Sequence, residues 1–109
     1  MLNRTQKTAA QQLADFAVAL TFDDGSSPFA VQIAQILREK GATATFFDVG
    51  SLDTTRGDIV RQIADLGFPI QGHSWDHAYP NTLAHGWTVP YLTDQINRTS
   101  ELDRQLTGH

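Results

Sequence analysis

The sequence predicts an α/β protein in which strands and helices alternate around a parallel sheet. Three short segments rich in apolar, β-branched or aromatic residues fit strands, and each precedes a stretch whose apolar residues have helical spacing. Such alternation is typical of parallel sheets joined by right-handed crossover helices. The expected strands are 17–22, 42–47 and 68–70, and the expected helices are 29–40, about 59–66 and about 92–106.

The first unit runs from Ala17 to Gly41. Its strand, from Ala17 to Phe22, is apolar on both faces, as in a parallel strand covered by helices. Gly41 follows the expected helix and suits the left-handed conformation of a C-terminal cap. The helix carries its apolar residues on one stripe, which consists of Phe29, Ile33, Ile36 and Leu37.

The next two units repeat this pattern. The second strand leads into Asp48, Val49 and Gly50, and the second helix is closed by Gly67. Pro69 lies near the start of the third strand, where a missing N–H is tolerated. The apolar stripe of the second helix consists of Ile59, Ile63 and Leu66, and the irregular stripe of the last helix includes Ile96 and Leu102.

Three strands with helices on one side do not close a barrel, and they leave edges that an independent domain has to cover. We therefore expect residues 17–109 to form the opening part of a larger (β/α) fold. Residues 1–16 are expected to be an extension with a short polar helix. This extension lacks the continuous apolar core of a signal peptide.

The composition excludes several classes of partner. The net charge is −4 and the 8 Lys and Arg residues are scattered, so no electrostatic footprint for nucleic acid or an anionic membrane exists. No apolar stretch approaches the roughly 20 residues that span a bilayer, which predicts a soluble protein. Because the chain has no cysteine, any metal must be held by imidazole and carboxylate groups.

Two chemically active segments follow the first and third strands. Asp23 and Asp24 follow the first strand in the run TFDDG, and His73 and His77 lie in the run HSWDH. Carboxyl ends of parallel strands share one face of a sheet, so these segments are expected to meet. Adjacent carboxylates need compensation, which a divalent cation bound by Asp24 and the two histidines would provide.

The H-x-x-x-H spacing fits two imidazoles one helical turn apart, with Asp24 as the third ligand and open positions for water. Asp23, if it is not a ligand, is placed to accept a proton from that water. Alone, each run has a simpler interpretation, as a solvated turn or as two surface histidines. Their joint placement after alternate strands favours the site.

Other polar and aromatic residues have weaker claims. Trp75 fits packing better than a lid or a sugar-binding role, and Ser74 and Asp76 are expected to support the histidines through hydrogen bonds. His85 and His109 are expected to be ordinary surface residues.

These runs resemble motifs of the polysaccharide deacetylase family, also called carbohydrate esterase family four or the NodB homology domain. Thr21–Gly25 is similar to its first motif, and the resemblance implies Asp23 as the catalytic base and Asp24 as a metal ligand. The segment 73–77 is similar to its H-S/T-x-x-H motif, which implies that His73 and His77 complete the metal triad. Segment 42–50 is similar to the family's second strand.

The resemblance implies a distorted (β/α) barrel that removes N-acetyl groups from chitin or peptidoglycan sugars, or O-acetyl groups from xylan. It implies one divalent ion, usually zinc and in some members cobalt, an acetylated carbohydrate as substrate, and an extracellular or cell-envelope location. Ser74 would brace the histidine loop. Gly72 departs from the family pattern, since many members carry Asn there.

By this resemblance, residues 17–109 are a partial NodB-like domain without the later motifs that supply the oxyanion donor and the general acid. Activity of the isolated chain is therefore open. One alternative is a half-barrel that works only as a homo-oligomer or with a complementary C-terminal fragment. Another is a non-catalytic metal- or sugar-binding protein. The substrate-binding residues are not identified by the sequence.

Overall fold

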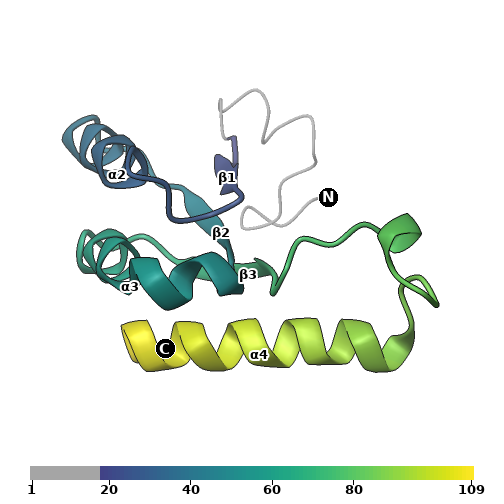
Figure 1. Cartoon of the computed structure of the whole chain (residues 1–109). Helices are drawn as coiled ribbons and strands as arrows, with labels where there is room; N and C mark the ends of the chain where they lie inside the picture. The colour runs from purple at the N-terminus through teal and green to yellow at the C-terminus, as the bar shows by residue number, and fades with distance from the viewer. Residues whose placement is uncertain (1–17) are drawn as a thin grey trace, which may run out of the picture.

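The computed structural model describes residues 18–109, so the helix expected within residues 1–16 lies outside the described part. Three parallel strands form one sheet in the order β1-β2-β3, and helices follow the strands in sequence (Figure 1). The predicted α/β class with parallel strands is confirmed. The elements are β1 (Thr21–Asp23), α2 (Ala30–Glu39), β2 (Thr45–Val49), α3 (Gly50–Asp65), β3 (Ile70–Ser74), the 3-10 helix η1 (Pro80–Thr82) and α4 (Val89–Thr107).

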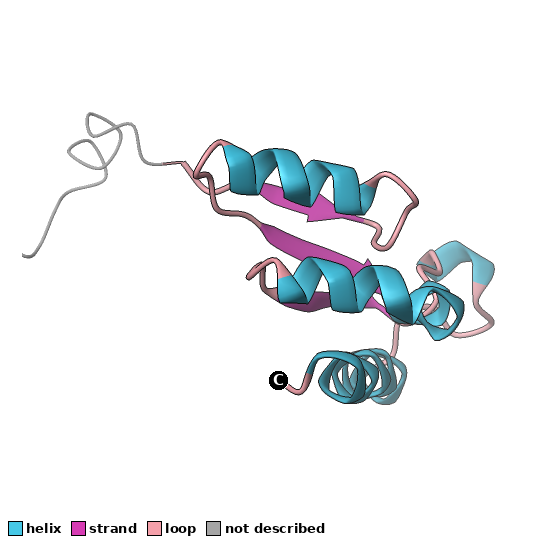
Figure 2. Ribbon diagram, turned by 90° about the vertical axis from the view of Figure 1, so that its left-hand side faces the viewer, coloured by secondary structure: helices cyan, strands magenta, loops and turns pink. Residues whose placement is uncertain are grey.

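The helices α2 and α3 lie on the same side of the sheet, and α4 lies next to α3 (Figure 2). α3 and α4 run in the same direction, because Gly50 at the start of α3 is close to Thr99, and Gly57, two turns later in α3, is close to Leu106. The carboxyl ends of all three strands therefore point to one edge, where the loops that carry polar residues gather.

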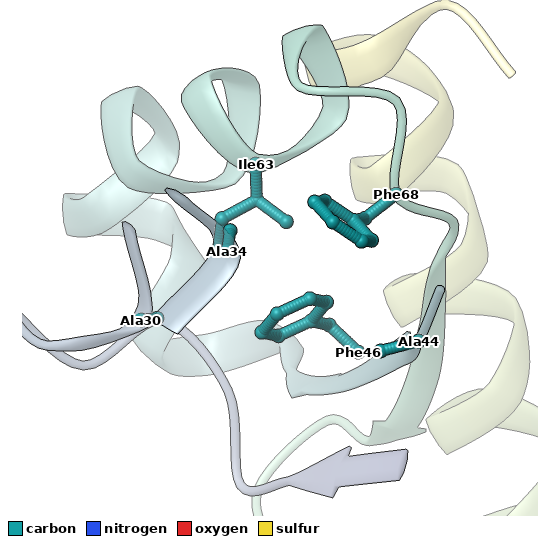
Figure 3. Close-up of a cluster of buried hydrophobic side chains, with 6 residues drawn as sticks. All are labelled: Ala30, Ala34, Ala44, Phe46, Ile63 and Phe68. Atoms are coloured by element: carbon teal, nitrogen blue, oxygen red, sulfur yellow. The ribbon is translucent and has the colours of Figure 1, made fainter. Parts of the chain in front are cut away.

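The hydrophobic core lies between the sheet and helices α2 and α3, with Phe46 of β2 at its centre (Figure 3). The Phe46 ring stacks on Phe22, with centroids 5.2 Å apart, and meets the edge of Phe68 at 5.8 Å. Such aromatic pairs contribute about 0.5–1.5 kcal/mol beyond the area that they bury. Together these contacts pack β1, β2 and the segment before β3 into one layer.

The first strand is shorter than predicted. Residues 18–20 are not part of β1, although the carbonyl of Leu20 accepts a hydrogen bond from Thr45 N at 3.0 Å. Val18 is 75% exposed and Leu20 40%, so the prediction of a strand buried on both faces from residue 17 is wrong for the described part.

The other two strands begin later than predicted. The amide of Ala42 donates to the carbonyl of Leu37, which ties residue 42 to the end of α2 instead of the sheet. Likewise, the amide of Phe68 donates to Ile63 at the end of α3, so Phe68 is buried in the core without belonging to β3. β3 also ends later than predicted, at Ser74, and therefore includes His73.

The buried faces of two helices also differ from the predicted stripes. Of the stripe predicted for α2, Ile33 and Leu37 pack against the core as expected, whereas the N-cap residue Phe29 and Ile36 are more than half exposed. The small residues Ala30 and Ala34 face the core in their place. Alanines allow close approach of the helix to the sheet, so they replace bulkier apolar groups at the contact. In α4, Ile96 is 65% exposed, while three polar residues are buried at helical spacing: Gln95, Thr99 and Asp103.

α2 and α3 have no side-chain N-cap, and each is followed by a glycine. α3 follows β2 directly at Gly50, earlier than predicted, and is kinked at Arg56, whose φ and ψ are −124° and 25°. Gly41 and Gly67 follow α2 and α3 with positive φ, as expected for C-terminal caps.

Among residues 18–109, no helix has the length and apolar character needed to cross a membrane.

Candidate metal centre

Three side chains from distant parts of the chain converge at the carboxyl edge of the sheet. The Oδ1 atom of Asp24 lies 3.2 Å from Nε2 of His73 and 3.1 Å from Nε2 of His77. The two imidazole rings are stacked, with centroids 5.2 Å apart. Among the described residues, this is the group of His and acidic side chains whose ligand atoms are close enough to share an ion.

The spacing of these atoms fits a small divalent ion. Ligands at about 2.0–2.1 Å from a tetrahedral ion are about 3.3–3.4 Å apart, close to the observed N–O separations. One carboxylate and two imidazoles form a donor set that zinc uses in open, catalytic sites. The side chains are between 30% and 64% exposed, so solvent and substrate can reach the remaining coordination positions.

The turn after β1 directs the carboxylate of Asp24. Asp24 has a φ of 69° and Gly25 a φ of 91°, so two successive left-handed residues reverse the chain directly after the strand. A side chain at Gly25 would also meet the backbone of β2, since a Cβ atom would lie 3.1 Å from Val49 N. Glycine is therefore required by both conformation and space.

The two histidines come from different kinds of structure. His73 belongs to β3, and His77 lies in the loop that follows, with a φ of 57°. The expected separation of one helical turn is wrong, because a strand end and a left-handed residue bring the rings together instead. Ser74 supports this loop as expected, since its Oγ accepts a hydrogen bond from the amide of His77 at 3.0 Å.

A second set of hydrogen bonds fixes the histidine loop to α4. Oε1 of Gln95 accepts from the amides of Trp75 and Asp76, and Nε2 of Gln95 donates to Oδ2 of Asp76. Oδ1 of Asp76 accepts from the amide of Ala78 and from the hydroxyl of Tyr91. The carboxylate of Asp76 thus holds the backbone of the loop and not the imidazole rings.

The pKa values of this set follow its hydrogen bonds. Desolvation opposes ionisation of Asp76, but hydrogen bonds from Tyr91, Ala78 and Gln95 outweigh it and lower the pKa of that carboxyl. The hydrogen bond between the Tyr91 hydroxyl and the Asp76 carboxylate raises the pKa of Tyr91 to about 12. Both groups therefore keep their donor and acceptor roles over the neutral pH range.

The remaining residues singled out in the sequence lie near or away from this centre. Asp23, the last residue of β1, is exposed next to Asp24. Trp75 packs, as expected: its ring lies against Gly50 and under the guanidinium of Arg98, 4.1 Å from the ring centroid. His85 and His109 are exposed, as expected.

A cluster of buried carboxyl groups lies between β2, α3 and α4 and was missed by sequence reasoning. Asp48, Asp53 and Asp103 are at most 5% exposed. Oδ1 of Asp53 accepts a hydrogen bond from the hydroxyl of Ser26 at 2.6 Å. Among residues 18–109, neither carboxylate oxygen of Asp48 has a hydrogen-bond partner. Burial and then the charges of Asp53 and Asp103 raise the pKa of Asp48 to about 7.

A groove of about 740 Å³ adjoins the metal centre, between β3 and α4. Its lining includes His73 and His77 and the exposed rings of Tyr79 and Trp87. Aromatic rings beside polar groups are chemically suited to sugars. The outer edge of β3 also faces this region, and within residues 18–109 no further strand pairs with it.

The family profile of polysaccharide deacetylases matches residues 10–109. Chitin deacetylase 1 of Cryptococcus neoformans is 33% identical over 96 residues, which cover 82% of this chain and 20% of that protein. Peptidoglycan-N-acetylglucosamine deacetylase PgdA of Listeria monocytogenes is 38% identical over 93 residues, covering 84% and 19%. The chain thus spans about a fifth of the length of these two relatives.

Solved structures agree with the sequence relatives. A peptidoglycan N-acetylglucosamine deacetylase, solved in complex with an N-oxidanyl-benzamide compound, superimposes with a TM-score of 0.73 at 32% identity. The superposition covers 84% of this chain and 41% of that structure. Sequence and fold lead to the same conclusion: the chain belongs to the polysaccharide deacetylase family.

Proposed function

We propose that this chain carries the metal-binding part of the active site of an enzyme that removes acetyl groups from a carbohydrate. The observation that carries the proposal is the convergence of Asp24, His73 and His77 within ion-sharing distance in a member of this family. We take zinc as the ion, with cobalt as the second choice, because the donor set combines imidazole and carboxylate in an open site.

The substrate class follows from the relatives. The two described above are named for deacetylation of chitin and of peptidoglycan N-acetylglucosamine. Both polymers contain N-acetylated amino sugars, so we propose an N-acetyl group as the preferred substrate and O-acetylated xylan as the weaker one. The groove beside His73 and His77, with Tyr79 and Trp87 on its rim, supports a sugar substrate.

Each residue has a distinct role in this proposal. A bound zinc ion supplies Lewis acidity toward an acetyl carbonyl. Asp23, exposed beside the metal centre, accepts the proton of the attacking water as general base. Asp24, His73 and His77 hold the ion, and Ser74 holds the backbone of His77 in place.

The test uses a chimaera, because the chain spans less than half of the solved relative. Residues 18–109 replace the aligned segment of the Listeria enzyme, and acetate release is measured from an N-acetylated chito-oligomer, peptidoglycan and acetylated xylan. Asp24→Asn and Asp23→Asn versions of the chimaera are measured beside it. The native Listeria enzyme, which is named for peptidoglycan deacetylation, is the positive control for the peptidoglycan assay.

We expect zinc-dependent acetate release from the N-acetylated substrates, a loss of zinc and activity in Asp24→Asn, and a loss of activity with zinc retained in Asp23→Asn. Equal activity in the chimaera and its Asp24→Asn version would contradict the proposal. Zinc binding without acetate release from any substrate would instead favour the non-catalytic metal-binding alternative.

A further inference from the structure

The position of His77 depends on a loop and not on a regular element. His73 is held in β3 by the sheet, whereas His77 lies beyond the strand with a left-handed backbone. Its imidazole must nevertheless keep Nε2 within 3.1 Å of Asp24 Oδ1. Something outside the strand has to fix the segment between the two histidines.

Gln95 of α4 makes the contacts that can do this. Its side chain is 5% exposed, and Oε1 accepts from Trp75 N at 2.8 Å and from Asp76 N at 3.0 Å. Two amide donors on one oxygen identify that atom as the carbonyl oxygen of the side chain. The amide nitrogen then faces Oδ2 of Asp76 at 3.2 Å as a donor.

Asp76 completes the connection on the loop side. Its Oδ1 accepts from the amide of Ala78 at 3.0 Å and from the hydroxyl of Tyr91 at 2.7 Å. The residue after His77 is therefore hydrogen-bonded to the carboxylate of the residue before it, and α4 holds this carboxylate from two successive turns through Tyr91 and Gln95. The loop cannot shift His77 without breaking several of these bonds.

The helix is itself fixed against β3. One turn after Gln95, Thr99 is fully buried and packs on Gly72, where an added Cβ would lie 3.0 Å from Cγ2 of Thr99. At Gly50, an added Cβ would lie 2.9 Å from Oγ1 of Thr99. The two glycines let α4 approach β3 and the start of α3 closely, so Gln95 has a rigid base from which to hold the loop.

We infer that Gln95 and Asp76 form a positioning pair that sets the geometry of His77 for metal binding. The inference rests on the proposed metal site and adds a part of the chain, α4, that contributes no ligand of its own. Groups that orient metal ligands typically change metal affinity by about 10- to 100-fold when they are lost. The pair should therefore control zinc affinity although neither side chain contacts the ion.

The donor and acceptor pattern allows an exchange experiment on the 109-residue chain. Gln95→Glu keeps an acceptor for the two amides but places a second carboxylate against Asp76. Asp76→Asn places a second amide against Gln95. In the double variant the partners are complementary again, with the new amide at position 76 donating to the new carboxylate at position 95.

Zinc affinity is measured by competition with a chromophoric chelator, at a temperature where the metal-free form of every variant is folded by circular dichroism. The visible absorption of bound cobalt reports the coordination geometry separately. Gln105→Glu is the matched control, because Gln105 is exposed on the same helix and bonds only Glu101 among the described residues.

We expect each single variant to bind zinc about 10-fold or more weakly, and the double variant to return to within about threefold of the native affinity. The cobalt bands should weaken in the single variants and recover in the double variant, while Gln105→Glu behaves like the native chain. Native zinc affinity in both single variants, or additive losses of affinity in the double variant, would overturn the inference that the pair positions His77. If the native chain itself fails to bind zinc, the inference about the pair fails, whereas the chimaera assay tests the proposed function separately.

Discussion

Oδ1 of Asp24 lies 3.1 Å from Nε2 of His77, and both residues have left-handed backbone conformations, with φ values of 69° and 57°. They are the non-glycine residues with positive φ among residues 18–109. Such conformations cost about 1–3 kcal/mol each and persist where the surroundings impose them, often at functional sites. Among the described residues, the backbone strain of this kind is thus concentrated on two of the three proposed metal ligands.

Asp24→Gly should therefore stabilise the metal-free chain while it removes a ligand. Glycine adopts positive φ without steric cost, so we expect the free energy of unfolding to rise by about 1 kcal/mol. Zinc affinity should fall by about 100-fold or more through loss of a direct ligand. Urea unfolding of the metal-free chain and zinc competition measure the two effects.

Asp23→Gly is the matched control, because Asp23 is the adjacent carboxylate but lies in β1 without positive φ. It should lower the free energy of unfolding by about 0.5–1 kcal/mol and leave zinc affinity within a few-fold of native. A similar loss of stability in both variants would show that the backbone of Asp24 is not strained.

The buried carboxyl groups predict an unusual dependence of stability on pH. Burial, followed by the charges of Asp53 and Asp103, raises the pKa of Asp48 to about 7, and burial, followed by Asp53, raises that of Asp103 to about 6. The folded state then retains protons that the unfolded chain has lost above its ordinary Asp pKa of 3.8. The free energy of unfolding should fall as pH rises from about 4 to about 7, and then level off.

Urea unfolding across this range measures the effect, which reaches about 1.4 kcal/mol per pH unit for each proton retained. Asp48→Asn should reduce the slope and raise stability at neutral and higher pH, because it removes one ionisable group from the cluster. Asp58→Asn, an exposed change on α3, should leave the native slope intact. An unchanged slope in Asp48→Asn would mean that this carboxyl is ionised in the folded protein at low cost.

Gly25 and Gly41 separate the effect of conformation from that of space. Both have positive φ, but an added Cβ at Gly25 would contact Val49 N and Asp48 Cα at 3.1 and 3.3 Å, whereas Gly41 has open space. Gly41→Ala should cost about 1 kcal/mol of stability, and Gly25→Ala about 1–3 kcal/mol more, since the backbone of β2 cannot move away. Gly25→Ala should also weaken zinc binding by displacing Asp24.

Chemical denaturation and zinc competition on the two alanine variants check this prediction. Equal losses of stability would indicate that the turn after β1 adjusts freely, and native zinc affinity in Gly25→Ala would disconnect the glycine from the metal centre.

The order of elements and the meeting of the two motifs were predictable from the sequence, because both follow from the alternation of periods and from the shared carboxyl edge of parallel strands. The boundaries of the strands were not predictable from the sequence. Ala42 and Phe68 have strand-like neighbours, but their amides are bound by the ends of the preceding helices, which a local pattern does not reveal.

The buried face of α4 was missed for a different physical reason. Gln95, Thr99 and Asp103 recur every four residues, which is a clear helical stripe, but it is polar, and apolar periodicity was the signal sought. A polar side chain in such a stripe can be buried when it finds hydrogen-bond partners, as Gln95 does in the amides of Trp75 and Asp76. The contribution of α4 to the site therefore became visible only in three dimensions.

The most direct test of the central claim is nitrogen-detected NMR of the histidine side chains with and without zinc. The geometry predicts that Nε2 of His73 and of His77 binds the ion, with the proton on Nδ1 in both rings. Zinc should shift these two Nε2 signals at one equivalent and leave His85 and His109 unchanged. Unchanged signals of His73 and His77, or equal shifts in all four histidines, would contradict a metal centre built by Asp24, His73 and His77.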